Sequence, residues 1–176
     1  MLHQQLGIFL LILLCFPSLT FLQIPLFMSS FSSTYLDIEY LAEPRIVAGN
    51  WRRGVMPFEL QRGYMALLDE AVSRRCRFWL INLSERASGL SAADLQWILE
   101  EFFPLLPFRL RRPVYIAYLM APHQLATSLS MPGMPDLTYF DSRPYRIERF
   151  TTQQEALDWL TLCRQQDARA RRRKTA

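Results

Sequence analysis

Charged side chains are missing from the beginning of the chain. None of the first 36 residues is Asp, Glu, Lys or Arg, so all 36 such residues lie in the remaining 140. Cysteine is scarce too, and the odd number and wide spacing of Cys15, Cys76 and Cys163 exclude a disulfide framework and a cysteine-ligated zinc site. With 51% hydrophobic and 20% charged residues, the 176-residue chain is neither disordered nor a stapled miniprotein, and it can bury the core of one domain.

The residues that most catalytic sites need are also few. Of the two histidines, His3 precedes the expected fold, so only His123, at the exit of an expected strand, could serve a Ser-His-Asp or Cys-His arrangement. No G-x-S-x-G motif is present, and the six glycines form no phosphate-binding loop. One usable histidine and scattered carboxylates give no metal-ligand spacing. The sequence therefore predicts no cofactor, no metal and no enzyme.

The apolar stretch of residues 6–28 allows three interpretations. It is long enough to cross a bilayer, but Pro17 and Pro25 interrupt it, and no Lys or Arg flanks it. A secretory signal would need a basic start and a small-residue cleavage site, and neither is visible. Met28 followed by Ser-Ser-Phe-Ser-Ser resembles a natural start, which would make residues 1–27 translated upstream DNA. We expect residues 1–33 to lie outside the domain.

Positive charge is concentrated at the other end. Residues 164–176 carry six basic side chains and one acid, Asp167, whereas the preceding chain has a net charge of −1. The pI near 9.2 thus describes a basic tail, expected to be disordered or a fraying helix, and predicts no specific nucleic-acid binding by the domain.

Between these ends, residues 34–163 have the pattern of a single α/β domain. Alternating or continuously apolar runs predict five strands, at 34–41, 45–51, 78–83, 114–119 and 145–150. Helical spacing and capping signals predict four helices, which begin at Pro57, Ser91, Pro122 and Thr152, with Pro104 and Pro107 ending the second. The resulting order, β-β-α-β-α-β-α-β-α, predicts an antiparallel hairpin joined to a mostly parallel sheet flanked by helices. We expect Leu80, Ile81, Ile116, Leu157 and Leu160 to be buried.

Aromatic and serine residues supply the remaining candidates for a site. Trp51 and Trp97 lie beside expected core positions, so they are either packing residues or part of an aromatic-lined pocket. Ser88 and Ser91 precede the second main helix, where a phosphate group would meet the positive end of the helix dipole. Ser91 is in the first place a helix cap.

Several landmarks together resemble a known family. They are Phe78–Leu83, Asp94–Trp97, Phe103-Pro104 and Phe150–Leu160, and their spacing is similar to that of small bacterial STAS-like (SpoIIAA-like) proteins, in particular a branch associated with Bacteroidetes. The resemblance spans about residues 34–160 and implies a non-enzymatic regulatory domain.

The better-known members of this family bind a kinase partner and are switched by phosphorylation of a serine that follows an acidic residue. In this chain Ala87 stands where the acid is expected before Ser88, and Asn82 stands where relatives often have Asp. Both departures weaken the case for a phosphorylation switch.

Taken together, these features predict a cytoplasmic, STAS-like regulatory or protein-interaction module. Its protein partner is not identified by the sequence, and membrane attachment would depend on residues 6–28. A small-molecule or lipid-binding module with an apolar pocket, and an enzyme using His123, remain as alternatives.

Overall fold

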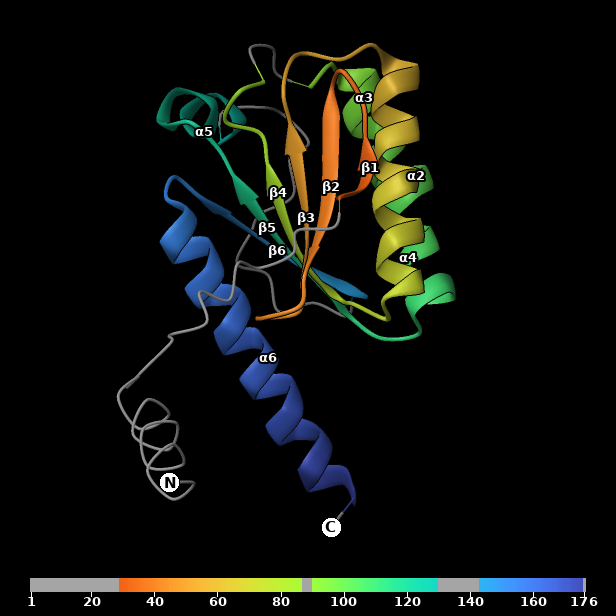
Figure 1. Ribbon diagram of the computed structural model, residues 1–176, viewed down its shortest axis with the longest axis vertical. Helices are drawn as coiled ribbons and strands as arrows, with labels where there is room; N and C mark the ends of the chain where they lie inside the picture. Colours follow the sequence, from red (N-terminus) through yellow and green to blue (C-terminus); the bar gives the residue numbers. More distant parts are fainter. Residues whose placement is uncertain (1–28, 87–89, 130–142, 176) are drawn as a thin grey trace, which may run out of the picture.

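The computed structural model describes residues 29–86, 90–129 and 143–175. Within them, six strands form one sheet in the order of the sequence (Figure 1). The strands are β1 (Ser29–Ser32), β2 (Leu36–Leu41), β3 (Ile46–Trp51), β4 (Phe78–Asn82), β5 (Val114–Leu119) and β6 (Tyr145–Phe150).

The direction of pairing changes once across the sheet. Strands β1, β2 and β3 pair antiparallel, whereas β3, β4, β5 and β6 pair parallel. The register places Ile38 opposite Gly49 in the antiparallel part, and Ile81 opposite Tyr118 in the parallel part. The expected α/β class, with an N-terminal antiparallel hairpin and a parallel remainder, is confirmed.

Helices cover the sheet on both faces. They are α2 (Pro57–Ser73), α3 (Ala92–Trp97), the π-helix η1 (Ile98–Phe102), α4 (Phe103–Leu110), α5 (Pro122–Leu129) and α6 (Gln153–Thr175). The helices α2, α3 and α4 lie on one side of the sheet, and α6 crosses the other side and projects beyond it (Figure 1). When two neighbouring strands run parallel, the chain leaves the first strand at one edge of the sheet and must return to the opposite edge before the second strand begins. A helix packed on one face of the sheet supplies this connection.

The close contact between α2 and the sheet depends on one glycine. Leu60, Tyr64 and Leu67 of α2 are buried, as their helical spacing predicts. A Cβ atom at Gly63 would lie 2.4 Å from the Trp51 ring and 2.9 Å from a methyl group of Leu36. Glycine therefore lets the helix backbone approach the sheet over the fully buried Trp51.

The second main helix is longer than the sequence predicts. Pro104 and Pro107 do not end it, because α3, η1 and α4 follow one another without a break from Ala92 to Leu110. The wider π-helical turn comes directly before α4, Pro104 follows it in the first turn of α4, and Pro107 lies inside α4.

Two boundaries also differ from those expected. Strand β1, at 29–32, pairs with β2 although the apolar segment was expected to extend to residue 33. Helix α6 runs to Thr175, across the expected start of the tail at residue 164. No helix of the described residues is long and apolar enough to cross a membrane, and the candidate segment 6–28 lies outside them.

The core lies where the apolar runs predict it. Leu80, Ile81, Ile116 and Leu160 are buried, and all six residues of β5 are buried as well. Leu157 is only partly buried, because it lies toward the side of α6 rather than at the centre of its contact with the sheet. Trp159 is also partly buried and packs against Tyr115 and Phe150.

Candidate functional site: an arginine-lined pocket

The residues proposed from sequence do not converge on one site. His123 is exposed on α5, beyond the carboxyl end of β5, and no side-chain hydrogen bond of this residue occurs within the described parts of the chain. Trp51 is fully buried and packs against Tyr35 and Tyr64. Trp97 is half-buried on α3 and stacks on Phe102. Both tryptophans thus act as packing residues, and neither contacts His123 in the structure.

Ser91 forms the predicted helix cap. Its hydroxyl oxygen accepts a hydrogen bond of 3.1 Å from the backbone N–H of Asp94, and the Asp94 carboxylate accepts one of 3.2 Å from the backbone N–H of Ser91. A phosphate on Ser91 would lose this cap and face the carboxylate of Asp94. Ser88 lies outside the described residues.

A buried polar cluster lies between α2 and the sheet. The hydroxyl groups of Tyr64 and Tyr118 are 3.2 Å apart, and burial raises the pKa of both, that of Tyr118 most strongly. Arg86, in the loop after β4, is 3% exposed, and its Nε has no hydrogen-bond partner. Burial lowers the pKa of Arg86, while the nearby Tyr64, Asp94 and Tyr118 act in the opposite direction. The sequence does not predict that Arg86 is buried, because an arginine in a loop is ordinarily exposed.

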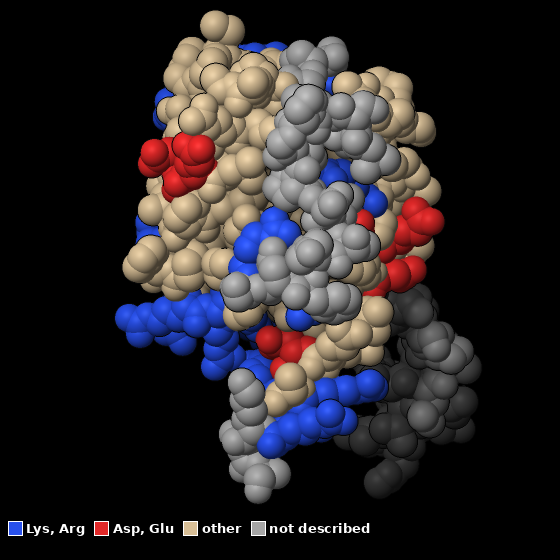
Figure 2. All heavy atoms as spheres, turned by 180° about the vertical axis from the view of Figure 1, so that it is seen from behind, with Lys and Arg blue, Asp and Glu red and all other residues tan. Residues whose placement is uncertain are grey.

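A pocket of about 400 Å³ opens at the amino-terminal edge of the parallel strands, away from His123. Seven arginines contribute to its lining, and we call it the arginine pocket: Arg45, Arg75, Arg77, Arg109, Arg112, Arg164 and Arg171. The remaining lining residues include Cys76 and Phe78. Figure 2 shows from behind that Lys and Arg gather at this end, on and beside the C-terminal part of α6.

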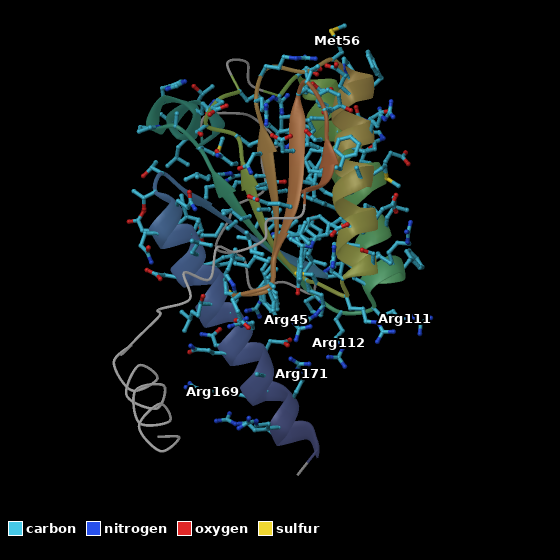
Figure 3. The ribbon with its side chains drawn as sticks, in the orientation of Figure 1. Arg45, Met56, Arg111, Arg112, Arg169 and Arg171 are labelled. Carbon is cyan, nitrogen blue, oxygen red and sulfur yellow. The ribbon has the colours of Figure 1, made fainter. Side chains whose placement is uncertain are left out.

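Three connections and two helices bring these arginines together, and Arg109 lies on one of these helices, α4. Arg45 lies in the turn before β3, Arg75 and Arg77 lie between α2 and β4, and Arg112 lies between α4 and β5. The other side of the pocket is α6, which carries Arg164 and Arg171. Figure 3 shows Arg171 on the part of α6 that projects beyond the sheet.

Few carboxylates compensate this charge. Asp167 of α6 pairs with Arg77 at 2.6 Å and with Arg171 at 3.1 Å, and Asp69 of α2 pairs with Arg109 at 2.9 Å. The Arg164 guanidinium donates to the backbone carbonyl of Pro44. Among the residues that the structure describes, these ion pairs join two carboxylates to three of the seven arginines, and Glu43 also lies near Arg45. Seven arginines against these three carboxylates leave an excess of positive charge among the described residues of the pocket.

The chemistry of the pocket is that of anion binding. Arginine offers five fixed N–H donors that match the oxygens of carboxylates and phosphates, and several arginines at one site favour a ligand with more than one negative charge. The Cys76 thiol hydrogen-bonds to backbone carbonyl oxygens, and burial raises its pKa. The thiol is therefore neutral at physiological pH and is not an activated nucleophile.

In the described residues, no group of three or more His, Cys, Asp or Glu side chains could hold a metal ion.

Comparisons of the chain with protein-family models, curated proteins and solved structures found no match.

Proposed function

We propose that this protein is a non-catalytic binding module whose arginine pocket takes a multiply charged anion. The observation that carries the proposal is the backbone conformation of three arginines. Arg45, Arg75 and Arg111 have φ values of 68°, 49° and 56°, in the left-handed region that favours glycine. All three lie at the pocket end of the molecule, and two of them, Arg45 and Arg75, line the pocket itself.

The ends of α2 and α4 show why these positions are informative. The backbone N–H groups of Arg75 and Cys76 bond to the carbonyls of Val72 and Ala71, which is the Schellman ending. The N–H of Arg111 bonds to the carbonyl of Pro107, which is the simpler left-handed ending.

Glycine is the usual residue at both of these positions, and a side chain there costs about 1 kcal/mol. Arg45 and Arg75 occupy left-handed positions in the lining of the pocket, and Arg111 occupies one at the same end of the molecule. This repetition supports a requirement for the positive charge at these positions.

Regulation is the second part of the proposal. The STAS-like resemblance implies a cytoplasmic regulatory module with a protein partner, and a pocket whose Cys76 thiol stays neutral supports binding rather than chemistry. The pocket differs from the apolar cavity expected of a lipid-binding module, because arginines dominate its lining. His123 lies on α5, at the other end of the parallel strands, so an enzyme built on this residue would not use the pocket.

Calorimetric titration of the full chain with inorganic pyrophosphate at low salt tests the proposal. We expect saturable binding that weakens as salt rises, because the interaction is largely electrostatic. Arg75→Gly removes one guanidinium and also relieves the left-handed backbone. This variant should bind pyrophosphate about tenfold more weakly, yet be at least as stable as the parent.

The matched control is Arg62→Ala, which removes an exposed arginine of α2 that does not line the pocket. It should bind pyrophosphate as the parent does. Equal binding by Arg75→Gly and the parent, or a similar loss in both variants, would show that the pocket is not the site.

A further inference from the structure

Exposed apolar side chains lie on α4, the helix that contributes Arg109 to the arginine pocket. Phe108 of α4 is 80% exposed and Leu105 is 36% exposed. Residues 105, 108 and 109 share one face of the helix, and Arg109 lines the pocket. The helix that lines one side of the pocket therefore also exposes an aromatic ring to water.

A second exposed apolar pair lies at the opposite end of the molecule, where Met56 and Phe58 begin α2 (Figure 3). The two ends of the molecule differ in how far their arginines are paired with carboxylates. At the Met56 end, Arg53 donates to both carboxylate oxygens of Glu59, at 3.0 and 2.8 Å, and Arg52 pairs with Asp37. The arginines there are neutralised, whereas the pocket end keeps its excess.

The extension of α6 adds to this excess. Arg169 and Arg173 are exposed on the part of the helix that projects past the sheet. Figure 3 shows Arg169 and Arg171 on this extension at the same end of the molecule as Arg111 and Arg112. The end of the molecule that carries the pocket thus combines a cationic cavity, a cationic helix and an exposed aromatic ring.

We propose that this end docks on the surface of a membrane that contains anionic phospholipids. Lipid phosphate groups occupy the arginine pocket, the α6 extension lies near the charged headgroups, and Phe108 enters the boundary between headgroups and acyl chains. Attachment of this kind needs both charge and apolar insertion, since one signal alone gives only weak, reversible binding. The inference rests on the proposed anion-binding function and names the source of the anion.

The exposed ring favours a lipid over a soluble phosphate compound. A small anion would contact the guanidinium groups of the pocket and leave Phe108 in water. A bilayer contacts the pocket and α4 together, so it removes the ring from water while it pairs the arginines. This joint contact gives the exposure of Phe108 a physical reason.

Sedimentation of the full chain with vesicles tests the docking. The vesicles contain phosphatidylcholine alone or with 30% phosphatidylserine, and neutral vesicles measure any attachment through the apolar residues 6–28. We expect the anionic vesicles to bind at least tenfold more tightly, with an affinity that falls steeply with salt. Phe108→Ser should weaken this binding about tenfold, and Arg112→Ser about fivefold.

The matched control is Phe58→Ser, which removes a ring of 67% exposure from the other end and should leave vesicle binding unchanged. Equal binding to neutral and anionic vesicles, or equal effects of Phe108→Ser and Phe58→Ser, would overturn the docking. Pyrophosphate binding distinguishes anion binding by the pocket from membrane docking. Phe108→Ser should bind pyrophosphate as tightly as the parent does. Pyrophosphate binding without vesicle binding would leave a soluble anion as the ligand. Tight binding of single-stranded RNA, unaffected by Phe108→Ser, would replace the membrane with a polynucleotide.

Discussion

At the scale of single residues, Arg86 is the most unusual side chain of the fold. It is 3% exposed, its Nε lacks a hydrogen-bond partner, and no ion pair of this residue occurs within the described part of the chain. A buried donor left unpaired costs about 1–3 kcal/mol, and the removal of the guanidinium from water adds to that cost. Arg86→Met keeps an extended, flexible side chain and removes both penalties.

We therefore expect Arg86→Met to raise the free energy of unfolding by about 1–3 kcal/mol, measured by urea denaturation. Arg62→Met, at an exposed position of α2, should change it by less than about 0.5 kcal/mol. A clear loss of stability in Arg86→Met would instead show that the guanidinium has a partner in the folded protein.

At the scale of elements, one ion pair attaches the extension of α6 to the sheet. Arg77 is 8% exposed and donates to the carbonyl of Pro113 at 2.8 Å and to the carboxylate of Asp167 at 2.6 Å. Removal of one member of a buried pair leaves the other charge uncompensated. Asp167→Asn should lower the free energy of unfolding by about 2–3 kcal/mol.

The control for this prediction lies on the same helix. Asp158 is exposed, and within the described residues its carboxylate accepts a hydrogen bond from Gln154 in its own helix, so Asp158→Asn should cost less than about 0.5 kcal/mol. Equal effects of the two substitutions would mean that the C-terminal part of α6 contributes nothing to the fold. Hydrogen exchange across residues 164–175 would show the same difference locally, with faster exchange in Asp167→Asn.

At the scale of the whole molecule, the buried acids predict how stability depends on pH. Burial raises the pKa of Tyr64, Tyr118 and Cys76, and it raises the pKa of Cys163 to about 11. In the unfolded chain these groups release their protons at lower pH, near pH 9 for the thiols. Above that pH the folded state binds more protons than the unfolded state, so stability falls as pH rises.

We expect the free energy of unfolding to be constant through neutral pH and to decline from about pH 9 to pH 11 under reducing conditions. Cys163→Ala removes one of the contributing groups, so the decline should be less steep in this variant. Constant stability up to pH 11 in the parent would contradict the burial of these groups.

The strands and most helices follow from local patterns. Apolar runs and alternation predict β2 to β6 within one or two residues, because a strand buried on one or both faces must repeat that pattern in sequence. Pro57 and Ser91 also mark helix starts correctly, since capping involves only neighbouring backbone groups. Two local signals misled: Pro104 lies inside a helix, and β1 falls in the segment that the charge pattern had set apart.

By itself, the sequence determined the class of the fold, the strand positions and the accumulation of positive charge after residue 163, because these depend on composition and on short-range periodicity. Only the tertiary structure decided where that charge acts. Arg45 and Arg171 are separated by more than one hundred residues. They line the same pocket because α6 crosses the sheet toward the edge at which β3, β4 and β5 begin. The strain at Arg75 is likewise invisible in sequence, since a backbone angle follows from how a helix must end against the next strand.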